Sequence, residues 1–159
     1  MGYVRWLGHA AFEIEVGGKV ILVDPWLTNP KSPVSPNDIS KADYIIVTHD
    51  HGDHLGEAVD ISKRLGASII ATYELANSLS EKGAKTVGAN IGGPIKLEGI
   101  EVILVQATHS STLGSPTGAI IRGKEATIYH AGDTGIFSEM ELFGKMYRID
   151  IALLPIGGH

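Results

Sequence analysis

The sequence contains no cysteine among its 159 residues. This absence excludes disulfide bonds and also excludes metal sites that are built on thiolates. Any metal ion in this protein must therefore be held by imidazole nitrogens and carboxylate oxygens. Seven histidines and 18 acidic residues are available as such ligands.

Excess positive charge and long apolar runs are also lacking. The formal net charge is −5, and no run of lysine or arginine forms a basic patch. We therefore expect no nucleic acid and no membrane among the partners, and a small-molecule substrate fits better. No stretch approaches the roughly 18 apolar residues of a membrane span, and the first residues lack the features of a signal peptide. We expect a cytoplasmic protein.

The composition that is present, with 43% hydrophobic and 19% charged residues, is typical of one globular domain over residues 1–159. Apolar alternation and apolar runs predict an α/β protein with a layered sheet. A tight hairpin turn is expected at "VGGK", and a proline-rich loop at 25–36. Strands are predicted at 3–8, 11–16, 19–24, 44–49, 67–72, 94–99, 100–108, 118–123, 125–131 and 150–156, and helices at 55–65, 73–82 and 137–147.

The stretch "THDHGDH", residues 48 to 54, directly follows the buried strand "YIIV". His49 and His51 are two positions apart in extended chain, so their imidazoles point the same way and can share one metal ion. Asp53 and His54 fall where the chain turns into a helix, where they can face a second ion beside the first. The alternative is that Asp53 merely caps the helix and the histidines are polar loop residues.

Further ligands are needed, because two per ion are too few for zinc. His109 ends the strand "VILVQAT" and is a candidate for the third imidazole of the first ion. Asp133 in "HAGDTG" follows another strand and is a candidate for a carboxylate that bridges both ions, with Gly132 and Gly135 allowing a tight turn. Asp24, at the end of "VILVD", suits a supporting role that fixes the tautomer of a ligand imidazole.

Weaker signals surround this cluster. His130 lies on an apolar strand and is predicted to be a hydrogen-bonded core histidine. His9, Ser110 and Ser111 are candidate substrate contacts, although loop residues of these types often satisfy only local backbone groups.

The motifs "THDHGDH", "THSS", "HAGDTG" and "LPIGG" resemble the metallo-β-lactamase superfamily. Within it, "WLGHAAF" and "ALLPIGG" resemble the UPF0173-like metal-dependent hydrolases near the ascorbate-6-phosphate lactonases. The resemblance implies a four-layer αββα sandwich and two divalent ions, usually zinc or manganese. Motif matching then assigns His49, His51 and His109 to the first ion, and Asp53 and His54 to the second, with Asp133 bridging.

One departure from the family concerns the region after "LPIGG", where members continue with a strand, a helix and a final histidine ligand. This chain ends at His159, a weak candidate for that ligand. We therefore expect a domain that is incomplete at its C-terminus. Its expected partner is its own C-terminal segment as a separate chain, or a further copy in a homo-oligomer, because an uncovered sheet exposes apolar surface.

The chemistry follows from charge. Two adjacent divalent ions lower the pKa of a bound water until hydroxide exists near neutral pH, and they polarise the bond to be broken. Asp53 and His54 are the catalytic candidates, with Asp53 orienting the hydroxide. The expected reaction is hydrolysis of a small-molecule ester, lactone or phosphoester. Two alternatives remain, namely a metal-dependent nuclease or phosphodiesterase and a non-catalytic metal-binding subunit.

Overall fold

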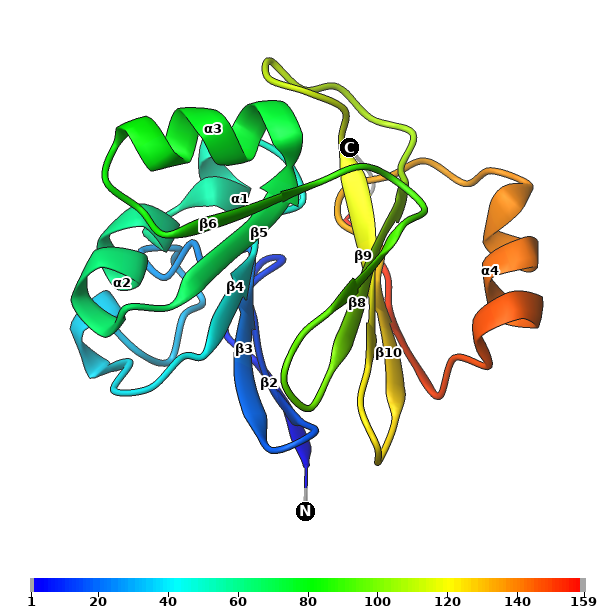
Figure 1. Cartoon of the computed structure of the whole chain (residues 1–159), viewed down its shortest axis with the longest axis horizontal. Helices are drawn as coiled ribbons and strands as arrows, with labels where there is room; N and C mark the ends of the chain where they lie inside the picture. The colour runs from blue at the N-terminus through cyan, green and yellow to red at the C-terminus, as the bar shows by residue number, and fades with distance from the viewer. Residues whose placement is uncertain (1, 158–159) are drawn as a thin grey trace.

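The structure, a computed structural model, describes residues 2–157 and has two β-sheets packed face to face with helices on both outer sides (Figure 1). The first sheet has the order β1 (Tyr3–Trp6), β2 (Phe12–Val16), β3 (Lys19–Val23), β4 (Tyr44–Ile46), β5 (Ser68–Thr72) and β6 (Thr86–Ala89). The second has the order β11 (Ile151–Leu153), β10 (Thr127–His130), β9 (Thr117–Arg122), β8 (Glu101–Gln106) and β7 (Pro94–Lys96). The four-layer αββα prediction is confirmed.

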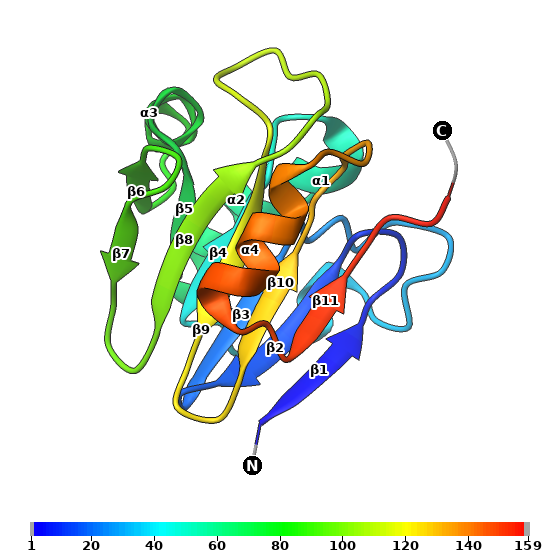
Figure 2. The same cartoon turned by 90° about the vertical axis from the view of Figure 1, so that its right-hand side faces the viewer.

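Helices α2 (Ala58–Leu65) and α3 (Tyr73–Glu81) cover the outer face of the first sheet, and α4 (Glu139–Tyr147) covers that of the second (Figures 1 and 2). Two shorter elements are the single helical turn α1 (Gly52–Leu55) and the 3-10 turn η1 (Pro36–Asp38) in the proline-rich loop. Within residues 2–157, no helix has the length and apolar character needed to cross a membrane.

The first sheet changes from antiparallel to parallel pairing along the chain. Strands β1, β2 and β3 form an antiparallel meander, and the predicted hairpin turn is confirmed at Gly17 and Gly18, which have φ values of 59° and 74°. Strands β3 to β6 are parallel. Parallel strands are covered on both faces, which explains why β5 is buried at every position. The carboxyl ends of β3 and β4 therefore lie side by side at one edge.

The core has three layers of apolar side chains. Between the sheets, isoleucines and valines of both inner faces pack together, among them Ile14, Ile21, Ile46, Val102 and Ile121. A second cluster lies between the first sheet and α2 and α3, and a smaller third cluster lies under α4. This packing holds the ends of strands from both sheets in fixed relative positions.

Two features of the local structure differ from expectation. The helix expected at 55–65 is present as α2 but begins only at Ala58, because Gly56 adopts a φ of 43° and separates α1 from α2. A Cβ atom at Gly56 would lie 2.4 Å from Trp26 Cα, so this close approach requires glycine. Strand β6 was not expected, because "TVGA" is short and contains a glycine. Its pairing with β5 stabilises it instead.

Candidate metal centre

The predicted metal ligands lie at one end of the sandwich, where several strands end. Asp24 follows β3, the "THDHGDH" stretch follows β4, and Asp133 follows β10. The segment from 107 to 116, which contains His109, lies at the same end as α1 in both views (Figures 1 and 2). Backbone contacts join these parts: Thr117 N–H donates to the carbonyl of Thr48 at 3.0 Å.

The three histidines assigned to the first ion come together. One donor atom from each of His49, His51 and His109 lies within 4.8 Å of the other two. His49 Nε2 is 3.0 Å from His51 Nδ1. Two donor atoms on one tetrahedral zinc lie about 3.3 Å apart, since each bond is about 2.0 to 2.1 Å long. This spacing fits two nitrogens that face the same ion.

A second group lies beside the first. Donor atoms of His49, His54 and Asp133 lie within 4.8 Å of one another. Asp133 Oδ2 is 3.1 Å from His54 Nε2 and 3.7 Å from His109 Nε2. The Asp133 carboxylate thus lies between the two groups, where a bridging ligand would have to lie. Asp53 Oδ2 is farther from His54 Nε2, at 4.0 Å.

Asp24 is fully buried beneath these histidines and connects two of them. Its Oδ2 accepts from His54 Nδ1 at 2.7 Å and from the Thr48 hydroxyl at 2.7 Å. Because the Thr48 hydroxyl donates its one proton to Asp24, it accepts at 3.0 Å from His49 Nδ1. Both imidazoles are therefore held through Nδ1, which leaves Nε2 of each for another partner.

Burial and charge shift the pKa values in opposite directions at the two buried histidines. Burial, followed by the nearby His54, lowers the pKa of His49 to about 4, so its imidazole is neutral. Burial also acts to lower the pKa of His54, but the charge and hydrogen bond of Asp24 outweigh it and raise that pKa to about 9. Burial opposes ionisation of Asp24, yet His54 keeps the Asp24 pKa below its usual value. The floor of the site is thus a buried ion pair.

The residues fit a divalent cation. His54 Nε2 is buried and makes no hydrogen bond, although Asp133 Oδ2 is only 3.1 Å away. An unpartnered buried nitrogen facing a carboxylate is costly, and a cation between the two atoms removes that cost. With no cysteine in the chain, the donors are imidazole and carboxylate, which suit zinc and also manganese.

The weaker candidates have varied surroundings. His130 is confirmed as a hydrogen-bonded core histidine: its Nε2 donates to the carbonyl of Ala10 at 2.9 Å and its Nδ1 accepts from Gly132 N–H. The Ser111 hydroxyl contacts Asp50 Oδ1 and the carbonyl of Leu113, so local groups already use it. Ser110 is exposed. His159, predicted as a weak candidate ligand, lies outside the described residues.

Three residues make contacts at the site that the sequence did not predict. Thr48 relays the contact from Asp24 to His49. Asp50 accepts hydrogen bonds from the backbone of Thr112 and Leu113, which belong to the segment that contains His109. His9, predicted only as a substrate contact, forms a third potential metal group with Asp53 and His54. The density of acidic and imidazole residues in "THDHGDH" was the only signal that pointed toward Asp50.

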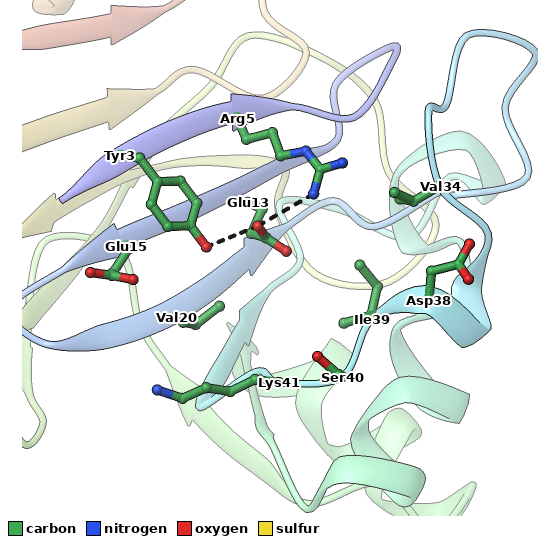
Figure 3. Close-up of a pocket in the computed structure, with 10 residues that line it drawn as sticks. All are labelled: Tyr3, Arg5, Glu13, Glu15, Val20, Val34, Asp38, Ile39, Ser40 and Lys41. Carbon is green, nitrogen blue, oxygen red and sulfur yellow. Dashed lines mark hydrogen bonds and ion pairs between the residues drawn. The ribbon is translucent and has the colours of Figure 1, made fainter.

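A separate hollow lies away from this cluster, beside β1 to β3 and the segment from 34 to 41 (Figure 3). Three of its side chains contact one another: Tyr3 Oη donates to Glu13 Oε1 at 2.9 Å, and Arg5 Nη1 lies 3.8 Å from the same oxygen (Figure 3). None of the ten residues that line it belongs to the histidine cluster. The hollow is therefore separate from the strand-end cluster.

Comparison with known proteins agrees with this geometry. Residues 19–159 match the family model of the "Beta-lactamase superfamily domain". The chain is 60% identical to a "UPF0173 metal-dependent hydrolase" of Caldivirga maquilingensis, with 100% of this chain and 71% of the relative covered. It is 55% identical to a protein of the same description from Thermofilum pendens, covering 100% of this chain and 73% of that one.

A solved structure is also similar to the chain. It is described as Igni18, a novel metallo hydrolase from the hyperthermophilic archaeon Ignicoccus hospitalis KIN4/I. The TM-score is 0.93 at 46% sequence identity, and the match covers 98% of this chain and 71% of that one. The resemblance to UPF0173 proteins is thereby confirmed, whereas the closeness to ascorbate-6-phosphate lactonases stays a prediction.

Proposed function

This chain belongs to the UPF0173 metal-dependent hydrolases of the β-lactamase superfamily, and from that premise we propose that it hydrolyses a small-molecule ester, lactone or phosphoester with two divalent ions. His49, His51 and His109 would hold the first ion, Asp53 and His54 the second, and Asp133 both. Zinc is the proposed metal and manganese the alternative, because imidazoles dominate the donor set.

One observation above all supports this assignment. His54 Nε2 faces the Asp133 carboxylate in a buried position without a hydrogen bond, while Asp24 fixes the opposite side of the same ring. A purely structural histidine would have both nitrogens satisfied, as His130 has. The arrangement around His54 is instead that of an imidazole oriented to offer Nε2 to a metal ion.

Ions held by these groups would lower the pKa of a water molecule and polarise the bond to be broken. The chain's own residues orient the reactants. The Asp53 side chain is 41% exposed, so its carboxylate can accept a hydrogen bond from the attacking water and direct the oxygen toward the substrate. Asp24 keeps His54 in one orientation during the reaction. The His109 side chain is partly exposed, which leaves this side open to substrate.

The charge of the molecule supports a small substrate over a nucleic acid. The net charge is −5, and the carboxylates of Asp53 and Asp133 are partly exposed at the site. A polyanionic chain would meet repulsion there and would find no basic groove along which its phosphates could bind. A single ester, lactone or phosphoester needs only the local positive charge of the site.

The test is a metal and activity assay on the wild-type chain and on His51→Ala. Each is loaded with Zn²⁺ or Mn²⁺, analysed for metal content, and assayed with an ester, a lactone and a phosphodiester. We expect His51→Ala to lose the first ion and its hydrolytic activity while remaining folded, because the side chain leaves a loop and not the core. Lys145→Ala on α4 is the control and should behave as wild type.

Normal hydrolysis with full metal content in His51→Ala would contradict the proposal. Two bound ions without hydrolysis of any substrate class would favour the non-catalytic metal-binding subunit. RNA binding that weakens steeply with added salt, together with phosphodiester cleavage, would favour the nuclease.

A further inference from the structure

His9 lies on the turn between β1 and β2, and surrounding contacts fix the backbone of this turn. Ala11 N–H donates to the carbonyl of Gly8 at 2.9 Å, and Trp6 Nε1 donates to the carbonyl of His9 at 2.9 Å. His9 itself has a φ of 48°, in the left-handed region that few residues other than glycine adopt. The turn therefore fixes the point from which the His9 side chain extends.

The His9 side chain reaches α1, the helical turn that contains Asp53. His9 Nε2 lies 3.0 Å from Asp53 Oδ2. An ionised carboxylate can only accept a hydrogen bond, so His9 is the donor and carries a proton at Nε2. No other side chain in residues 2–157 hydrogen-bonds this carboxylate, and the Asp53 side chain is 41% exposed. Because the terminal torsion of an aspartate is broad, the carboxylate would rotate if this hydrogen bond were lost.

Aromatic contacts hold the His9 ring in place. It meets the rings of Trp26 and His54 edge to face, with centroids 5.3 and 5.4 Å apart. The backbone of Trp26 in turn lies against the end of α1, where a Cβ atom at Gly56 would be 2.4 Å from Trp26 Cα. Trp26 thus packs against both His9 and the helical turn to which His9 is hydrogen-bonded. The donor and its acceptor are therefore held by one set of contacts.

We propose that His9 is a positioning residue for Asp53, whose carboxylate it holds through Nε2–H in the orientation that directs the attacking water. This inference rests on the proposed function, because it requires Asp53 to act in hydrolysis. The role needs a hydrogen-bond donor at the position of Nε2, and it needs no contact of the imidazole with a metal ion. It differs from the substrate contact that the sequence predicted for His9.

Two substitutions separate the donor from the rest of the imidazole. In His9→Gln the amide nitrogen lies as many bonds from Cα as Nε2 of histidine does, so it can donate to Asp53. In His9→Asn the side chain is one bond shorter, so the donor is lost while the residue still tolerates the left-handed backbone. Arg148→Gln and Arg148→Asn are the matched controls, because they introduce the same residues at the same φ of 48° at the exposed end of α4.

Each chain is loaded with Zn²⁺, and kcat and KM are measured with para-nitrophenyl butyrate, γ-butyrolactone and bis(para-nitrophenyl) phosphate. In His9→Asn we expect kcat to fall by roughly 10- to 100-fold with KM unchanged, because Asp53 acts on the water and not on the bound substrate. His9→Gln should recover most of kcat, and both Arg148 variants should match wild type. If His9→Gln is as slow as His9→Asn, or if His9→Asn keeps the wild-type kcat, the assignment is wrong.

A second measurement does not depend on activity. In the Zn²⁺-loaded chain, heteronuclear NMR of the histidine side chains should show the His9 Nε2–H as a proton that exchanges slowly with solvent, assigned by its loss in His9→Asn. In Asp53→Ala this proton should exchange fast and its signal should disappear. A signal that persists unchanged in Asp53→Ala would overturn the assignment. If the wild-type chain shows the protected proton but hydrolyses none of the three probes, the contact is confirmed and the proposed function is wrong.

Discussion

The two halves of the sandwich are the first sheet with α2 and α3, and the second sheet with α4. They differ in how completely their helices cover them. Behind the first sheet, Ile61 of α2 and Leu75 and Leu79 of α3 are at most 2% exposed. Behind the second sheet, α4 contains no buried residue, and its Leu142 and Met146 are 50% and 60% exposed. The first half therefore has a helical layer that belongs to its core, whereas α4 only rests on the second half.

The metal centre reflects the same difference. The first half provides the "THDHGDH" stretch and the buried Asp24 beneath it, and the second half provides His109 and Asp133 from loops after β8 and β10. The first half thus fixes most of the proposed ligands in a rigid frame, and the second half brings two proposed ligands to it. An ion bound between them should hold the two halves together, because metal affinity is then also folding free energy.

The largest effect on stability should come from Asp24→Ala. The substitution leaves His54 as a buried charge without its partner, which costs about 3 to 5 kcal/mol of unfolding free energy. It also forces alanine into the left-handed backbone at φ 46°. Urea unfolding measures the loss. Asp24→Asn, which tolerates this backbone and removes only the charge, should be less damaging.

The counterpart in the second half is the exposed pair of Glu141 and Lys145 on α4. Glu141→Ala should leave the unfolding midpoint unchanged, since solvent screens this pair. Equal losses in Asp24→Ala and Glu141→Ala would show that the first half is not the more rigid frame.

The second prediction compares the same substitution in the two helical layers. Leu75→Ala in α3 removes a side chain that is 2% exposed and should lower the unfolding free energy by about 3 kcal/mol. Leu142→Ala in α4 removes one that is 50% exposed and should change it by about 0.5 kcal/mol or less. Both values come from denaturant titrations under the same conditions. A loss in Leu142→Ala as large as that in Leu75→Ala would mean that α4 is covered in solution.

The sequence predicts the metal cluster well because its members follow apolar strands. His49, His109 and Asp133 each come after a run that can only be a buried strand, and strand ends in a layered sheet meet at one edge. The same reasoning placed Asp24 under the histidines, and its contact with His54 Nδ1 is the one expected of a supporting carboxylate. The roles of these residues in metal binding stay predictions.

Contacts between loops could not be predicted in this way. Asp50 and Thr112 are 62 positions apart, and His9 and Asp53 are 44 apart, with no periodic pattern that joins either pair. Whether such loops meet depends on backbone details such as the φ of 48° at His9. Strand β6 and the break at Gly56 escaped prediction for a similar reason, because tertiary contacts decide both.

Asp50 joins the "THDHGDH" stretch of the first half to the segment of the second half that contains His109. It lies between His49 and His51 in the first half, and its carboxylate accepts from the N–H groups of Thr112 and Leu113 at 2.8 and 3.0 Å. Burial opposes ionisation, but these hydrogen bonds outweigh it and keep the pKa of Asp50 below its usual value. The charged carboxylate thus anchors the segment that contains His109 next to the other proposed ligands of the first ion.

Asp50→Ala should lower the global stability less than Asp24→Ala and Leu75→Ala do, and its effect should be local. Loss of hydrogen bonds to a charged acceptor at a partly exposed position costs about 1 to 2 kcal/mol. The amides of Thr112 and Leu113 should exchange with solvent faster, while those of β8 and β9 keep their protection. The first ion should bind about tenfold more weakly, because His109 must be ordered again on binding. Hydrogen exchange and a metal titration measure the two effects.

Ser111→Ala is the control, since it removes one hydroxyl contact to Asp50 and leaves both amide contacts in place. If Asp50→Ala leaves amide exchange and metal affinity unchanged, the second sheet holds the His109 segment in place without the help of Asp50.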